Sequence, residues 1–130
     1  MEAGGGETVT LLVFLTTTCA SCQPMWEMIS AGRQGDALGV DLVVVTPSRA
    51  LENEQEAHRR TPPGVHLHMG SDTWFAYGVG LAGTIVLVRH RDGEATPWEQ
   101  PGEVLGSSSS AGPGSVETVV RRWLEMAPRP

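Results

Sequence analysis

Lysine is absent from this chain of 130 residues, whose cationic side chains at neutral pH are nine arginines against fifteen acidic residues. The net charge of -6 excludes nucleic-acid binding through a basic surface, because that mode needs clustered cations to neutralise phosphates. Long apolar runs are also lacking: the longest, residues 11–15, is far shorter than the roughly 20 residues of a membrane-spanning helix. We therefore expect attachment to a membrane only through an anchor absent from this sequence.

The amino terminus has neither a positively charged region nor an apolar stretch, so no signal peptide is visible. Its glycines indicate a flexible tether over residues 1–7. The remaining length suits one hydrophobic core. We expect one domain over residues 8–127, followed by a tail at 128–130, and we expect it to be a monomer.

Cysteine is scarce as well. Two cysteines are too few for a framework of structural disulfides, and they lie three positions apart, as Cys19 and Cys22. The chemistry of this single motif, Cys-Ala-Ser-Cys, is therefore the main functional question.

The first half of the chain predicts a strand, a helix and a second strand. Residues 8–15 and 40–46 are rich in β-branched and apolar side chains, as in buried strands. Between them, apolar residues at helical spacing follow the cysteine motif, and Pro24 suits a first helical turn. Such a βαβ unit has parallel strands.

The second half predicts further short elements. Residues 49–60 are charged and indicate a surface helix, 65–69 a short strand, and Ser71 the cap of a short helix. Residues 84–90 indicate a strand, and Asp92-Gly93 indicates a hairpin turn whose partner strand lies near 95–98 or 104–105. The Gly/Ser-rich segment 106–114 predicts a flexible loop, and Ser115 the cap of a last amphipathic helix.

This order of elements is an α/β arrangement, βαβ followed by ββα, with a central mixed sheet flanked by helices. A Cys-x-x-Cys motif at the strand-to-helix turn of the βαβ unit is the plan of the thioredoxin fold. We therefore predict that fold.

Two segments strengthen this assignment. Residues 11–26, LLVFLTTTCASCQPMW, resemble the active-site segment of thioredoxin-like proteins, most closely the TlpA/MauD group of extracytoplasmic, membrane-tethered domains. Residues 77–88, YGVGLAGTIVLV, with Asp92-Gly93 after them, resemble the second signature of that group. The resemblance implies a thiol-disulfide oxidoreductase without a cofactor, acting on protein thiols or disulfides. It implies an extracytoplasmic location if an anchor has been removed, and otherwise a cytoplasmic one.

The chain departs from that pattern at three positions. Where the family has a cis-proline facing the disulfide, this sequence has Gly83; where thioredoxins have a buried carboxylate, it has Val13; and Thr18 replaces the usual tryptophan. A cis bond before a non-proline residue costs ~2.5–4 kcal/mol. We therefore expect a trans Ala82–Gly83 bond, weak generic disulfide reduction, and more activity in Gly83→Pro if the loop accepts a cis bond.

Placement at the start of a helix predicts different roles for the two cysteines. Unpaired amide groups and the helix dipole favour a thiolate at Cys19, the expected nucleophile, while Cys22 would resolve the mixed disulfide. The spacing allows a reversible Cys19–Cys22 disulfide. By the resemblance, the substrate groove would comprise Thr18, Ala20, Ser21, Ala82, Gly83 and Thr84.

Other residue groups favour ordinary structural roles. His66 and His68 share a strand face and could in principle join the cysteines around a metal, but exposed strand histidines are the more common case. An aromatic cluster at 74, 75 and 77 suits a core better than a partner groove, and Glu52, Glu54 and Glu56 indicate a solvated helix face. We expect no resident metal.

Two alternatives to the oxidoreductase stay open. The chain could be a thioredoxin-like module that binds a protein partner beside Gly83 with an inert cysteine pair. It could also bind a metal or cluster through Cys pairs of two chains, because the ring of the missing proline no longer covers the sulfurs.

Overall fold

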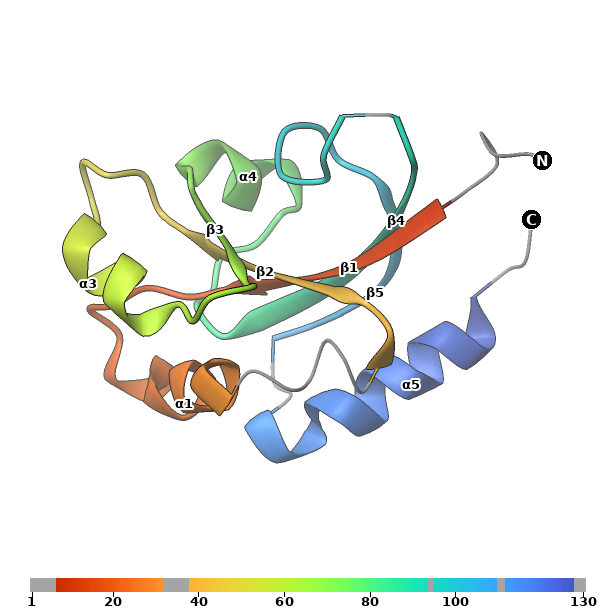
Figure 1. Cartoon of the computed structure of the whole chain (residues 1–130), viewed down its shortest axis with the longest axis horizontal. Helices are drawn as coiled ribbons and strands as arrows, with labels where there is room; N and C mark the ends of the chain where they lie inside the picture. Colours follow the sequence, from red (N-terminus) through yellow and green to blue (C-terminus); the bar gives the residue numbers. More distant parts are fainter. Residues whose placement is uncertain (1–6, 32–37, 94, 110–111, 128–130) are drawn as a thin grey trace.

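A single mixed sheet of five strands, in the order β3-β2-β1-β4-β5, forms the centre of the molecule in this computed structural model (Figure 1). The structure describes residues 7–31, 38–93, 95–109 and 112–127. The strands are β1 (Glu7–Phe14), β2 (Asp41–Thr46), β3 (His66–Met69), β4 (Thr84–Arg91) and β5 (Glu103–Ser108).

The strand β1 lies in the middle of the sheet. It pairs in parallel with β2 and antiparallel with β4, and residues 11–15 are fully buried. This is the environment that a strand apolar on both faces requires. The strands β3 and β5 complete the two edges, parallel to β2 and antiparallel to β4 respectively.

Helices cover both faces of the sheet (Figure 1). The helices α1 (Gln23–Ala31) and α5 (Val116–Met126) lie on one face, and α4 (Ser71–Ala76) lies on the other. The helix α3 (Glu54–Arg60) lies beyond the carboxyl end of β2. Two 3₁₀ turns, η2 (Ala20–Cys22) and η3 (Pro113–Ser115), precede α1 and α5.

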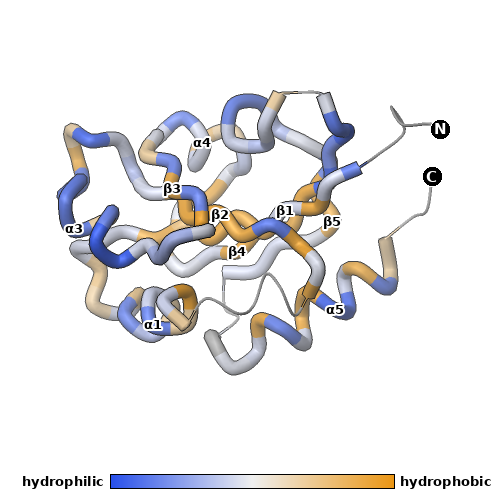
Figure 2. Tube along the Cα trace, viewed as in Figure 1, coloured by the Kyte–Doolittle hydropathy of each residue, from blue (hydrophilic) through white to orange (hydrophobic). Residues whose placement is uncertain are grey.

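The alternating side chains of the strands divide the core into two layers. Leu11, Val13 and Leu15 pack with α1 and α5, whereas Leu12 and Phe14 pack with Trp74, Tyr77 and Trp98. In Figure 2 the most hydrophobic tube follows the central strands, while α3 is largely hydrophilic. The βαβ and ββα halves therefore have the predicted thioredoxin arrangement, with β3 as the fifth strand.

Several element boundaries differ from the prediction. Glu7, assigned to the tether, is the first residue of β1, and the rest of the tether, residues 1–6, lies outside the described residues together with the tail at 128–130. The helix predicted over 49–60 begins at Glu54, because the side chain of Asn53 accepts a hydrogen bond from the Glu56 amide and caps it there. Gly70 occupies the cap position expected for Ser71, and the Ser115 side chain makes no capping hydrogen bond.

The largest correction concerns the segment predicted as a flexible loop. Its first residues, 106–108, belong to β5, where Gly106 pairs with Leu87 and lies beneath the indole of Trp123. A Cβ atom on Gly106 would lie 2.2 Å from the Trp123 ring. The glycine is therefore required for close packing of α5 on the sheet rather than for flexibility.

Substitution of Gly106 tests this packing. Gly106→Ala should lower the free energy of unfolding by about 1–3 kcal/mol, because the methyl group displaces Trp123 from its site. The matched control is Gly112→Ala, where a Cβ would meet no atom within 4 Å and the backbone φ is -73°. Urea denaturation of both variants measures the difference, and equal stabilities would show that Trp123 does not need the space.

Candidate functional site

The cysteine motif lies beyond the carboxyl end of β1, at the edge of the sheet where the parallel strand β2 also ends. Residues 15–18 connect β1 to the motif, and the Leu15 amide still donates to the Val45 carbonyl at 3.0 Å. Cys19 is the cap residue of η2, and its carbonyl accepts a hydrogen bond from the Cys22 amide at 3.1 Å. The motif therefore forms one tight turn that runs directly into α1.

The two sulfurs have different environments. Cys19 is partly exposed, whereas Cys22 is 1% exposed and packs in the core layer beneath α1. Both are free thiols, so the structure shows the dithiol form of the predicted disulfide pair. An accessible first sulfur and a buried second one are what a nucleophile and a resolving thiol require.

Hydrogen bonds lower the pKa of Cys19. The Cys22 thiol makes the largest contribution by donating to the Cys19 sulfur, followed by the Ser21 hydroxyl, whose oxygen lies 3.0 Å from that sulfur. A donor that stabilises the thiolate favours deprotonation. The pKa direction agrees with the sequence expectation, but the leading causes are these side-chain donors rather than the helix dipole, and η2 is only one turn long.

The pKa of Cys22 moves the other way, to about 11. Burial is the main cause, because a thiolate loses solvation in an apolar layer. The hydrogen bond to Cys19 contributes next, and the negative charges of Cys19 and Glu52 add to the rise. Cys22 therefore holds its proton while Cys19 is the more readily ionised thiol.

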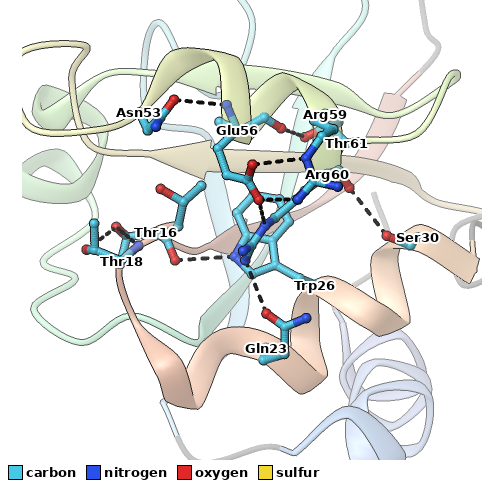
Figure 3. Close-up of polar contacts among 12 residues, drawn as sticks. Thr16, Thr18, Gln23, Trp26, Ser30, Asn53, Glu56, Arg59, Arg60 and Thr61 are labelled. Atoms are coloured by element: carbon cyan, nitrogen blue, oxygen red, sulfur yellow. Dashed lines mark hydrogen bonds and ion pairs between the residues drawn. The ribbon is translucent and has the colours of Figure 1, made fainter.

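The threonines before the motif are fixed by the first helix and by one another (Figure 3). The indole nitrogen of Trp26 donates to the Thr16 carbonyl at 3.3 Å, and the hydroxyl oxygens of Thr16 and Thr18 lie 3.1 Å apart. The guanidinium of Arg60 lies 5.8 Å from the centre of the Trp26 ring and donates to the Gln23 side chain at 3.2 Å. The end of α3 is thereby also connected to α1 by side chains beside the motif.

Glu52 was wrongly assigned to a solvated helix face. It precedes α3, is 8% exposed, and accepts a hydrogen bond from the Thr17 amide at 2.9 Å and another from the Thr17 hydroxyl. Glu54 and Glu56, by contrast, lie on α3 and form ion pairs with arginines. The signal that sequence reasoning missed is topological: the loops after two adjacent parallel strands meet at one sheet edge.

Burial raises the pKa of Glu52, but hydrogen bonds from Thr16, Thr17 and Asn53 outweigh it and leave the pKa below its ordinary value. Glu52 is therefore an anion buried beside the motif. Among the described residues no arginine or histidine lies within ion-pair distance of Glu52, and the backbone amides of Thr17 and Asn53 each donate a hydrogen bond to its carboxylate.

The Ala82–Gly83 peptide bond is trans, as predicted, and no cis bond occurs in the described segments. Gly83 has a φ of +94°, a left-handed conformation that favours glycine, and its amide donates to the Phe14 carbonyl at 2.7 Å. The glycine thus extends the pairing between β1 and β4 by one hydrogen bond. A proline could not adopt this φ, and it has no amide hydrogen to donate to the Phe14 carbonyl. The geometry therefore does not support the expectation that Gly83→Pro raises activity.

The predicted groove residues come from two segments. Thr18, Ala20 and Ser21 are exposed around Cys19, while Ala82 packs against the same core layer as Cys19. Thr84 is 7% exposed, and its hydroxyl donates to the Leu81 carbonyl at 2.6 Å, so it supports the loop from below. No hydrogen bond between the described residues joins Ala82 or Gly83 to either cysteine.

His66 and His68 cannot complete a ligand set with the cysteines. They pair with Val43 and Val45, whose side chains lie in the layer opposite to that of Cys22, and the His66 ring stacks on Trp98 at 4.3 Å. Within the described residues, no three cysteine, histidine or acidic side chains gather as a metal site.

The aromatic cluster is divided between core and surface. Trp74 and Tyr77 pack edge-on against Phe14, with ring centres 5.3 and 6.3 Å away, as the core interpretation predicts. Phe75 is 88% exposed and lies outside that core.

Comparisons with known proteins define the fold. The chain resembles the structure of StoA from Bacillus subtilis (17% identity, 90% of this chain and 82% of that one, TM-score 0.60). It also resembles the N-terminal domain of PilB from Neisseria gonorrhoeae (14% identity, 93% and 79%, TM-score 0.58). A thiol:disulfide interchange protein from a Bacteroides species is similar as well (12% identity, 94% and 76%, TM-score 0.58).

A solved structure described as a thioredoxin-like protein in its oxidised form is similar too (15% identity, 95% and 82%, TM-score 0.59). Together with the mixed five-stranded sheet, this shows that the chain has the thioredoxin fold, in agreement with the prediction. Neither protein-family profiles nor curated protein sequences match it. Among the described residues, no helix is long and apolar enough to cross a bilayer.

The hydroxyl of Ser21 provides a direct test of the Cys19 environment. Ser21→Ala should raise the pKa of Cys19, because a donor to the thiolate is lost, and slow its alkylation at pH 7 by roughly threefold, the effect of one ordinary hydrogen bond. Thr18→Val is the matched control, since the Thr18 hydroxyl pairs with Thr16 instead of the sulfur. An unchanged alkylation profile in Ser21→Ala would contradict the assigned role.

Two substitutions separate the functions of Gly83. Gly83→Ala should cost about 1–2 kcal/mol of stability from the positive φ alone, because its Cβ would meet nothing within 4 Å. Gly83→Pro also removes the bond to Phe14 and should cost about 3 kcal/mol or more. Urea unfolding measures the stabilities of both variants. A Gly83→Pro variant as stable as wild type would show that the loop adopts another conformation that accommodates proline.

Proposed function

We propose that this chain is a thiol-disulfide oxidoreductase that reduces or oxidises cysteines of a partner protein through Cys19 and Cys22. The observation that carries the proposal is the contrast between the two thiols at the end of β1. Cys19 is partly exposed with its pKa lowered by donors, and Cys22 is buried behind it with its pKa raised. This division of properties supports a nucleophile and a resolving thiol.

In the reducing direction, the Cys19 thiolate attacks one sulfur of a partner disulfide. A Cys19–partner disulfide forms, and the second partner sulfur leaves as a thiolate. Cys22 then loses its proton and attacks the Cys19 sulfur, which forms the Cys19–Cys22 disulfide and releases the first partner sulfur. Two electrons pass from the chain to the partner, and the reverse sequence oxidises a partner dithiol.

The resemblance of the two signature segments supports a TlpA/MauD-type protein that works outside the cytoplasm. Solved structures with this fold include a thiol:disulfide interchange protein, which supports the same class of reaction. By the same resemblance, the partner is expected to be a protein that carries thiols or disulfides.

A second candidate is a binding module with an inert cysteine pair. The trans Ala82–Gly83 bond favours this alternative, because the chain lacks the fixed backbone edge that the family presents to its substrates.

Two measurements distinguish the candidates. A reducible Cys19–Cys22 pair with a reduction potential between those of common thiol buffers supports an oxidoreductase, and Cys22→Ser should trap a mixed disulfide with the partner because the resolving thiol is gone. Cys19→Ser is the matched control and should trap nothing.

If Cys19→Ser captures partners as well as Cys22→Ser does, then Cys22 is the nucleophile and Cys19 the resolving thiol. A pair that stays oxidised under strong reductants, while wild type still binds a partner, would favour the binding module.

A further inference from the structure

Within the described part of the chain, Glu52 is the one buried charged side chain, and the fold does not explain its burial beside the cysteine motif. Burying a carboxylate without a cation is costly unless hydrogen bonds replace water. Glu52 receives them from the Thr17 amide at 2.9 Å, from the Thr17 hydroxyl, and from the Asn53 amide at 2.9 Å. Thr17, which lies two positions before Cys19, therefore provides two of these hydrogen bonds and holds the Glu52 carboxylate in place.

The same loop connects Glu52 to Cys22. Thr16, next to the anchor, is fixed by the Trp26 indole at 3.3 Å, and the Thr16 backbone amide donates to the Cys22 sulfur (Figure 3 shows Thr16 and Trp26). Cys22 is 1% exposed and Glu52 8%, so water screens the space between them weakly. Among the described residues, the charges of Cys19 and, to a smaller extent, Glu52 raise the pKa of Cys22.

We propose that Glu52 is a positioning residue whose negative charge, held in place by Thr17, makes it harder for the Cys22 thiol to give up its proton during resolution. This inference rests on the proposed oxidoreductase function and deepens it. In thioredoxins the buried carboxylate lies on the strand that corresponds to β1, where this chain has the fully buried Val13. Here the carboxylate of Glu52 comes from the loop between β2 and α3.

The charge should act on Cys22 both before and after a partner binds. Before a partner binds, a nearby anion disfavours a second thiolate, so the proton stays on Cys22 and its thiol can donate to the Cys19 thiolate. When Cys19 becomes part of a mixed disulfide, its own charge is lost and Glu52 remains as the anion facing Cys22. Cys22 then loses its proton to solvent as its sulfur attacks, and the partner leaves as a thiolate.

The test isolates Cys22 in a defined mixed disulfide. Wild type and Glu52→Gln are joined at Cys19 to thionitrobenzoate, and release of this coloured thiolate by Cys22 is followed from pH 7 to pH 11 by stopped flow. Glu52→Gln keeps the size and accepting oxygen of the side chain but removes its charge. The apparent pKa of Cys22 should fall by roughly half a unit or more, as expected when a nearby like charge is removed.

Two further variants make the result specific. Glu54→Gln is the matched control: its carboxylate is about half exposed and pairs with Arg49 at 3.2 Å, so its loss should leave the profile unchanged. Thr17→Val removes the hydroxyl that donates to Glu52 but keeps the carboxylate, so it should shift the apparent pKa of Cys22 in the same direction by a smaller amount. This variant replaces Glu52→Gln in the test if Glu52→Gln does not fold.

The outcomes are distinct. An unchanged or raised apparent pKa in Glu52→Gln, or an equal shift in Glu54→Gln, would overturn the role of Glu52. Because thionitrobenzoate release needs no natural partner, that result would leave the oxidoreductase proposal standing. If instead no thiol buffer reduces the Cys19–Cys22 disulfide, the oxidoreductase proposal itself is wrong.

Discussion

The parallel pairing of β1 with β2 is the contact on which the rest of the site depends. It runs from Thr10 opposite Asp41 to Phe14 opposite Val45, between strands that are almost wholly buried. Because parallel strands end at the same edge, the loop that carries Cys19 and the loop that carries Glu52 are brought together there. A slip of one residue would turn every side chain of β1 to the opposite core layer and would separate Thr17 from its carboxylate partner.

The two-layer core explains why the two cysteines differ. Odd-numbered residues of β1 face α1 and α5, and the tight turn of η2 directs Cys22 into that same layer. Cys19, the cap residue of the turn, lies at the boundary of this layer and is partly exposed. One hydrogen bond then acts on both thiols in opposite directions: donation from Cys22 lowers the pKa of Cys19 and raises that of Cys22. The difference in pKa follows from the burial of Cys22 and from the hydrogen-bond donors beside Cys19, and neither Ala20 nor Ser21 contributes a charge.

The features predictable from the sequence were those with strong local patterns. The apolar runs of β1, β2 and β4, the helical spacing after Cys22 and the Asp92-Gly93 turn specify the thioredoxin arrangement. The strand β5 was partly missed, because its residues 106–108 have the composition of a loop. Their conformation depends on pairing with β4 and on Trp123 from α5, which needs the space above Gly106. Glu52 was misassigned for a similar reason, since alternating glutamates indicate exposure unless a distant strand pairing buries one of them.

The departures from the family pattern have a common physical consequence. Proline at position 83 would remove the amide that bonds to Phe14, and a carboxylate at position 13 would lie in the fully buried layer of the sheet. This chain instead gains a main-chain hydrogen bond at Gly83 and places its buried anion in the next loop, where amides and hydroxyls solvate it. The buried carboxylate that acts on Cys22 therefore comes from the loop after β2 rather than from β1. Sequence changes in residues 47–53 should affect the thiol chemistry more than their distance from the motif in the chain implies.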